Sequence, residues 1–499
     1  MRQRTAPSGH GSLTTGAVTA VALAVQTGLA AVVGIIVART LGRTEETDGF
    51  FAAYGVFITL ALAATATRSV VMPRFVRARA ERRLAGEVAA VAGSLALVIV
   101  PLVVGGGLAT GQAAALLTGF GPEGARAAAA EVLPWLLAAG AGQFLAGLLA
   151  SAFAALDEYV VPAVGFAGGS VAGLALILAT IDGCGVVAVA WGMALNAAVA
   201  IAVPSVALAL RARRERMPRG AIRAGATGDG HTARLAEAGR GVALPLALQG
   251  LYLLCLPVAA RGGVGEVTSF GYAYLAGAAV VSVAASSLGL ATSVPLARAG
   301  LDPAQVARHV RASSWFALLA VAATAGVFAL AGEAILAALL GSGYDREVGT
   351  ALGRVVVAFA PWMVVTVALT VTFPLVFVAG RVADLPRIAA ATLLVHLPLA
   401  FAGQALAGLD GLAIALACST ALALCLVLGG LGAARATLVA LARPTLLVAV
   451  LAAAAFLTVG LAIDGPSAAA AGLVAFAALV AALRPAGLIE AWRYLRALG

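Results

Sequence analysis

The sequence is poor in charge and contains no lysine. Only 11% of its 499 residues are charged, and all 32 basic residues are arginine. A soluble domain has about one quarter charged residues and about half apolar ones, whereas 62% of this chain is hydrophobic. The composition therefore excludes an ordinary soluble protein. The net charge of +10 is typical of arginine-rich loops in a membrane protein, and we predict no nucleic-acid partner.

Motifs that carry enzyme chemistry are also missing. The sequence has no Walker motif, no GxGxxG at a strand–helix turn, no zinc spacing and no recognisable Ser/His/Asp set. Its four cysteines lie in or beside apolar segments without CxxC spacing, which favours a packing role for them. We predict that the protein is not an enzyme and has no cofactor and no metal site.

The chain consists largely of long apolar runs. A helix needs about 20 apolar residues to cross a bilayer, and runs of this length recur from end to end, separated by charged or Gly-, Pro- and Asp-rich breaks. They predict fourteen transmembrane helices and an all-α polytopic fold, with approximate spans at 14–38, 49–70, 88–108, 130–154, 160–181, 185–208, 242–260, 268–295, 313–332, 352–378, 386–404, 411–430, 444–463 and 467–483.

The arginines predict the orientation. With the N-terminus inside, the inner segments hold 25 of the 32 arginines and the outer segments hold six, while Arg68 lies near the inner end of the second span. This bias follows the positive-inside rule. It predicts a multi-pass protein of the cytoplasmic membrane with both termini in the cytoplasm.

The acidic residues are confined to loops and span ends. None of the 22 lies in the middle of a predicted span. A buried carboxylate within a span is the usual device that couples transport to protons or sodium. Its absence argues against ordinary coupling of this kind.

An internal repeat runs through the chain. Ala38-Arg39 aligns with Ala260-Arg261, and Pro73 aligns with Pro295 at the same offset of 222. Two further pairs of segments match in the same order: Pro134-Trp135 with Pro361-Trp362, and Asp182-Gly183 with Asp410-Gly411. Spans 1–6 and 7–12 are therefore predicted to be two parallel copies of a six-helix unit, an arrangement that places a substrate path between the copies.

The repeat predicts the domain organisation. We expect an N-terminal six-helix lobe at 1–210, a basic cytoplasmic linker at 211–240, a C-terminal six-helix lobe at 241–435, and two additional helices with a cytoplasmic tail at 436–499. The end of the linker, "HTARLAEAGRG" from His231, is either a short interfacial helix or part of a solvated segment.

Several ordered segments resemble the MurJ/MviN lipid II flippase family, within the multidrug, oligosaccharidyl-lipid and polysaccharide exporter superfamily. "TDGFF" from Thr47 is similar to the family's "ATDAFF", and "VAVAWGMAL" from Val187 to its "ALAWG" run. "ASAFAALDEYVVPAV" from Ala150, "LLGSGYD" from Leu339 and "DGLAIALACS" from Asp410 resemble further family segments. The resemblance covers about residues 15 to 435.

The chain departs from this family in one respect. The family carries arginines within spans 1, 2 and 8 that line a cationic cavity. The corresponding positions lie around Val33, around Ala61 and at Leu275. All three charges are absent, and Asp48 is the clear survivor of the family's charged set.

Two interpretations of Asp48 stay open. As a structural residue it would cap the second span, with Phe50 and Phe51 as interfacial aromatics. As a functional residue it would pair with Arg39 or Arg261 to latch an outward gate. The candidate cavity and gate residues are Gln26, Arg39, Asp48, Arg68, Gln249, Arg261, Leu275 and His396.

The resemblance implies a flippase or exporter that moves a lipid-linked glycan precursor, similar to lipid II and linked to undecaprenyl, by alternating access. Its partners would be membrane lipids and this substrate. One alternative is a cation-coupled exporter of drugs or natural products. The other is a non-transporting membrane scaffold for cell-envelope assembly proteins, which would use the arginine-rich loops.

The topology has a direct test. A cysteine placed at Met217, in the long basic segment, should be inaccessible to a membrane-impermeant thiol reagent added outside intact cells, because the arginine bias holds this segment inside. Labelling after permeabilisation is the positive control. Modification from outside would contradict the predicted orientation.

Overall fold

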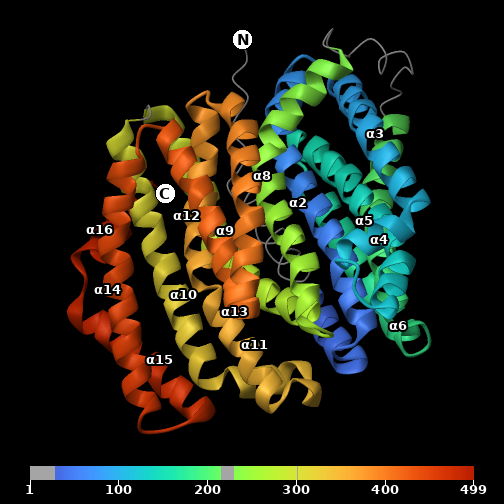
Figure 1. The fold of residues 1–499 in the computed structure, drawn as a ribbon. Coiled ribbons are helices and arrows are strands. Elements are labelled where there is room, and N and C mark those ends of the chain that lie inside the picture. The colour runs from blue at the N-terminus through green and yellow to red at the C-terminus, as the bar shows by residue number, and fades with distance from the viewer. Residues whose placement is uncertain (1–27, 215–229, 300–301, 499) are drawn as a thin grey trace. The chain divides into compact units, whose positions relative to one another are not determined.

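The computed structural model describes residues 28–214, 230–299 and 302–498, and throughout these ranges the regular structure is helical (Figure 1). The chain divides into two compact units, Met1–Gln249 and Gly250–Gly499. A helix at Gly28–Leu41 comes first. The other helices of unit 1 are α2 (Glu45–Ala80), α3 (Leu84–Leu108), α4 (Thr110–Leu117), α5 (Glu123–Ala155), α6 (Val160–Arg214) and the first part of α8 (His231–Ala259).

Unit 2 begins within α8. Its further elements are η1 (Ala260–Gly262), α9 (Glu266–Ala299), α10 (Pro303–Leu340), η2 (Ser342–Tyr344), α11 (Arg346–Ala358), α12 (Ala360–Val378), η3 (Val382–Asp384), α13 (Leu385–Gly430), α14 (Ala434–Gly460), α15 (Gly465–Leu483) and α16 (Ala486–Leu498).

The helices reproduce the predicted spans. Ten described segments are long and apolar enough to cross a membrane. Two of these segments, in α6 and α13, each contain two predicted spans joined across a kink. Counting each as two, and adding α9 and the shorter apolar helix at Gly28–Leu41, gives fourteen. Residues 14–27 of the first predicted span lie outside the described residues. The all-α polytopic fold is thus confirmed. The segment from His231, predicted as linker or interfacial helix, forms the first turns of α8.

The two kinks show the repeat at the level of the backbone. Gly185 in α6 has φ 52° and ψ −132°, and Gly408 in α13 has φ 56° and ψ −135°. Only glycine adopts a positive φ readily, so each glycine lets the chain turn back on itself. The pair lies 223 positions apart, close to the predicted offset of 222. Asp182 precedes its kink whereas Asp410 follows its own, so these two aspartates are not structurally equivalent.

Small residues bring the helices together. The two arms of α13 meet at Gly403 and Gly411, where a Cβ on either residue would run into the backbone of the other. The arms of α6 meet in the same way at Gly173 and Gly192. Apolar lipid gives no hydrophobic drive for helix association, so close backbone contact through small residues supplies the packing energy.

The two additional helices, α14 and α15, pack against α10 around one aromatic ring. Phe456 of α14 is buried, and its ring lies where a Cβ of Gly326 in α10 or of Gly472 in α15 would stand. Val448 and Phe476 complete this core. The ring therefore holds the last two spans to unit 2 and leaves no room for larger side chains at the two glycines.

In unit 1, α2 comes into close contact with the backbone of α5 at Gly49. A Cβ at this position would run into the Ala125 carbonyl oxygen and would lie 2.9 Å from the Ala129 nitrogen. These are backbone atoms, which do not give way as a flexible side chain would. The glycine in the "TDGFF" segment thus sets the spacing of α2 from α5 in this chain.

We expect Gly49→Ala to destabilise unit 1 by about 1–3 kcal/mol, the usual cost of overpacking. The measurement is the thermal unfolding midpoint of the detergent-purified protein. Gly183→Ala is the matched control, because a Cβ there meets nothing within 4 Å. Equal midpoints for the two variants would contradict the proposed close contact.

Candidate functional site

The start of α2 organises one end of unit 1. The Thr44 hydroxyl accepts a hydrogen bond from the Thr47 nitrogen, while the Thr47 hydroxyl accepts one from the Thr44 nitrogen at 2.8 Å. This reciprocal capping box fixes the helix start. In the first turn, the Glu45 carboxylate accepts a hydrogen bond from the Gly124 nitrogen at 3.1 Å. The acidic turn therefore ties α2 to the beginning of α5.

Asp48 lies one turn inside α2 and is only 6% exposed. Because Thr44 is the N-cap, the interpretation of Asp48 as the helix cap is wrong, although its charge still lies near the positive end of the helix dipole. Phe50 and Phe51 are 3% and 2% exposed, so they are core residues of unit 1 rather than interfacial aromatics. Phe50 stacks on Tyr54 with ring centroids 5.5 Å apart.

The gate hypothesis for Asp48 stays a prediction. Arg39 is exposed near the end of the helix at Gly28–Leu41, close in sequence to the start of α2. Arg261, the other expected partner, belongs to unit 2. There its guanidinium carbon lies 4.7 Å from the centre of the Phe401 ring, an attractive cation–π contact. Arg261 is thus engaged within its own unit.

His396 is a buried structural residue. Its Nε2 lies 3.0 Å from the Leu251 carbonyl oxygen, and its Nδ1 lies 2.9 Å from the Ser419 hydroxyl oxygen. The Cys255 sulfur is 3.4 Å from Nε2. Both ring nitrogens therefore have partners, and the imidazole connects α8 with the two arms of α13. This geometry is that of a satisfied core histidine.

The other candidates are distributed over both units. Gln249 is 2% exposed in α8 at the end of unit 1, and Leu275 is half-buried on α9 in unit 2. Beside Leu275, Tyr274 stacks on Tyr252 with centroids 3.9 Å apart. Gln26 lies outside the described residues.

Arg68 is the candidate with the most informative surroundings. It lies on α2 twenty residues after Asp48, or about 30 Å along the helix axis. The aliphatic part of the Arg68 side chain passes Gly147 of α5, and a Cβ added to Gly147 would lie 3.2 Å from Arg68 Cδ. The side chain is exposed on unit 1, and it makes no hydrogen bond or ion pair with the described residues. A cation without a carboxylate in an apolar span is a candidate ligand site.

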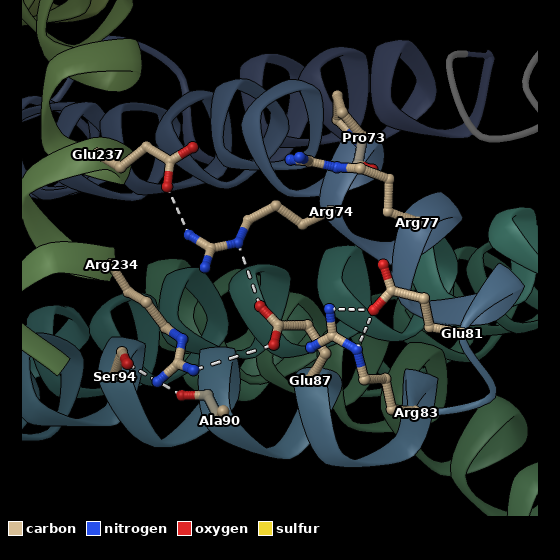
Figure 2. Close-up of polar contacts among 10 residues, drawn as sticks. All are labelled: Pro73, Arg74, Arg77, Glu81, Arg83, Glu87, Ala90, Ser94, Arg234 and Glu237. Carbon is tan, nitrogen blue, oxygen red and sulfur yellow. Dashed lines mark hydrogen bonds and ion pairs between the residues drawn. The ribbon is translucent and has the colours of Figure 1, made fainter. Parts of the chain in front are cut away.

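An ion network that was not predicted from the sequence lies at the opposite end of α2 from Asp48. Glu87 of α3 is 1% exposed. Its carboxylate lies 3.1 Å from Arg74 Nε of α2 and 3.9 Å from Arg234 Nη2 of α8. Arg74 also pairs with Glu237 of α8 (Figure 2). Two arginines and two glutamates thus join three helices of unit 1.

A small cavity of about 20 Å³ lies against this network. Apolar residues such as Val71, Val91 and Leu95 line it, together with Arg74 and Arg234. A space of this size accommodates one water molecule and is too small for a substrate. Nearby, the Ser94 hydroxyl lies 2.9 Å from His231 Nδ1 at the start of α8. The network is therefore a structural anchor for α8 within unit 1.

The sequence did contain a signal for this network. Glu87 follows the arginine-rich stretch that ends at Arg83, at the inner end of a span where basic residues predominate. An acid in that setting needs a cationic partner if it is buried. What the sequence could not supply is the partner, because Arg234 is 147 positions away. Among the described residues, no cluster of three or more His, Cys, Asp or Glu side chains is placed to hold a metal ion.

Comparisons with known proteins place the fold. No family model matches the chain, and no curated protein matches it. Solved structures do match. An inward-facing multidrug resistance MATE family transporter of the MOP superfamily has a similar fold: it aligns over 85% of this chain and 94% of its own, with 16% identity and a TM-score of 0.58.

Two further structures are similar. The lipid II flippase MurJ, in an inward closed conformation, aligns over 96% of this chain and 99% of its own, with 12% identity and a TM-score of 0.69. A MOP superfamily transporter from Pyrococcus furiosus aligns over 87% and 96%, with 16% identity and a TM-score of 0.53. The resemblance found in the sequence is thus confirmed for the fold, and all three are transport proteins rather than enzymes.

We expect Glu87→Gln to destabilise the protein by about 3–5 kcal/mol, because it removes the buried carboxylate near Arg234 and leaves Arg74 with only the exposed carboxylate of Glu237. The measurements are the thermal unfolding midpoint and hydrogen exchange of the amides at 231–241. Glu81→Gln is the control. Glu81 pairs with Arg83 at the surface, and such pairs contribute at most about 1 kcal/mol. An effect of Glu87→Gln as small as that of the control would contradict the anchor.

Proposed function

We propose that the protein is a flippase that moves a lipid-linked glycan precursor, similar to lipid II, across the cytoplasmic membrane by alternating access. The proposal is supported by the fold shared with MurJ over nearly the whole of both chains and by the ordered sequence segments that resemble its family. With the predicted orientation, both termini lie in the cytoplasm.

The observation that carries the proposal on this chain is Arg68. A lipid-linked precursor has an anionic phosphate group between its apolar tail and its glycan. The tail can stay in the bilayer while the head group crosses, but the phosphate needs a cation within the apolar region. Arg68 is exposed on unit 1 and has no carboxylate partner among the described residues. Its guanidinium can therefore form paired hydrogen bonds with a phosphate.

The three arginines that the family carries and this chain lacks indicate how its substrate would differ from that of the family. Val33, Ala61 and Leu275 are half-buried apolar residues, so the three cationic positions that the resemblance implies are neutral here. A site with one cation fits a head group of lower charge, or one whose charge is neutralised in another way. The substrate is accordingly proposed as a class, with lipid II as its first member to test.

A second candidate is an exporter of small drug-like or natural-product molecules. The MATE transporter, described as a multidrug resistance protein, shares the fold at a TM-score of 0.58, and the neutral positions at Val33, Ala61 and Leu275 suit an apolar substrate. The absence of a carboxylate in mid-span weighs against ordinary cation coupling. Dye or antibiotic efflux that collapses with the ion gradient would favour this candidate.

A scaffold role is the third possibility, and the arginine-rich segment after Pro73 offers a test of it. Within unit 1, Arg79 pairs with Asp157 and Arg83 pairs with Glu81. These ion pairs use part of the charge that a scaffold would present to an acidic partner, which favours transport. Loss of function only when Arg77, Arg79, Arg82 and Arg83 are neutralised together would reverse this preference.

We expect Arg68→Gln to abolish complementation in cells that depend on this protein, and Arg68→Lys to retain part of it, because the lysine keeps the charge but not the paired hydrogen bonds. The measurement is growth together with the amount of unflipped precursor after depletion of the native protein. Arg240→Gln is the control, since Arg240 is an exposed arginine of the same unit that is not proposed to bind substrate.

Two results would contradict the proposed function. The first is that depletion of the protein leaves cell-wall precursors and surface glycans crossing the membrane normally. The second is that Arg68→Gln, expressed at the native level, complements as well as Arg240→Gln.

A further inference from the structure

The C-terminal helix α16 is amphipathic and packs on unit 2 through one face. Ala491 is buried in the core formed with Ala312 and Trp315 of α10, and Leu488 and Tyr494 pack against the same core. Gly487 lies against the Trp315 indole, where a Cβ would come within 2.9 Å of Nε1. These contacts hold α16 beside the beginning of α10 (Figure 1).

Two apolar side chains of α16 outside this core are exposed. Trp492 is 59% exposed and Ile489 is 40% exposed. The Trp492 ring lies near Phe316 of α10, with centroids 6.2 Å apart. A tryptophan beside an aliphatic residue on an exposed helix face is typical of a helix that lies in the boundary layer between lipid head groups and acyl chains.

Four arginines of α14, α15 and α16 have no partner among the described residues. Arg484 ends α15, Arg493 lies on α16, and Arg435 and Arg443 lie in the first turns of α14, which packs against α10. All four are exposed, and none makes a hydrogen bond or ion pair with the described residues. They are therefore available to an external anion.

Carboxylates are scarce at this end of the bundle. Besides the four arginines, α10 contributes Arg308 and Arg311, whereas the acids among the described residues at the start of α10 and on α16 are Asp302 and Glu490. Asp384, which precedes α13 at the same end, pairs with Arg381 at 2.6 Å. Asp302 caps α10, and Glu490 pairs with Arg311 at 3.0 Å. Both acids are thus engaged, and the surface keeps a net positive charge next to the apolar face of α16.

From this combination we infer that the outer face of α16, with Arg484, Arg493, Arg435 and Arg443, is a binding surface for anionic phospholipid. The occupant is a phospholipid with a net negative head group, as in phosphatidylglycerol. Its phosphate meets the arginines and its acyl chains lie against Trp492 and Ile489. Arginine binds phosphate through paired hydrogen bonds, and the apolar pair requires a ligand that also has a hydrocarbon part.

The experiment uses Trp492 as the reporter. The full-length protein is reconstituted in vesicles of phosphatidylcholine that contain brominated phosphatidylglycerol, and in phosphatidylglycerol vesicles that contain brominated phosphatidylcholine. The part of the quenching of tryptophan fluorescence that is lost in Trp492→Phe is assigned to Trp492. We expect brominated phosphatidylglycerol to quench Trp492 more strongly than brominated phosphatidylcholine does. This preference for phosphatidylglycerol should disappear at about 1 M salt, where charges are screened within about 3 Å.

The variants then test the arginines. Replacing Arg484 and Arg493 by glutamine should lower the preference for phosphatidylglycerol by up to about fivefold per arginine, the effect expected of one basic residue at an anionic surface. The lysine replacements should retain it. The control is the pair Arg346→Gln and Arg354→Gln, which removes the same charge from α11, the helix that follows the far end of α10.

The proposal is overturned if brominated phosphatidylglycerol and phosphatidylcholine quench Trp492 equally in the native protein. It is also overturned if the control pair lowers the preference as much as the Arg484 and Arg493 pair, which would indicate a general charge effect. Competition by inorganic phosphate at constant ionic strength would indicate a site for free phosphate in place of the lipid. None of these results depends on which substrate the protein transports.

Discussion

Close contact between helix backbones is the constraint on which both units depend. In lipid, helices gain nothing by hiding apolar side chains from one another, so association rests on packing and on the few polar contacts available. Gly49 lets α2 approach α5, and the pairs Gly403–Gly411 and Gly173–Gly192 close the arms of α13 and α6. These five glycines are therefore structural, because a side chain at any of them would force the helices apart.

The charged side chains within the helices also depend on the few polar contacts that are available there. Within unit 1 the buried carboxylate of Glu87 has two arginines near it, and the network ties α8 to α2 and α3. Arg68 differs, because it is an arginine of an apolar span that has no counter-charge among the described residues. The contrast separates arginines that hold the fold from an arginine that is available to a ligand. In unit 2, His396 likewise belongs to the fold, since both ring nitrogens have partners.

The fold was predictable from the sequence because its signal is local. Each span is an apolar run with its own breaks, and the kink glycines Gly185 and Gly408 lie where the sequence placed the ends of spans. The candidate site was less predictable because its contacts are distant. The pairing of Glu87 with Arg234 depends on which helices become neighbours. The N-cap of α2 was not predicted either, because Thr44 and Asp48 are both good capping residues and only the backbone conformation distinguishes them.

The central claim is that this chain moves a lipid-linked glycan across a bilayer, and a reconstituted assay tests it most directly. Protein-containing and protein-free vesicles would carry an undecaprenyl-pyrophosphate-linked glycan with a labelled head group, and the fraction of head groups accessible to an external modifying reagent would be followed over time. We expect the native protein to accelerate the appearance of internal head groups at the surface and Arg68→Gln not to do so. Equal rates with the native protein and without protein would contradict it.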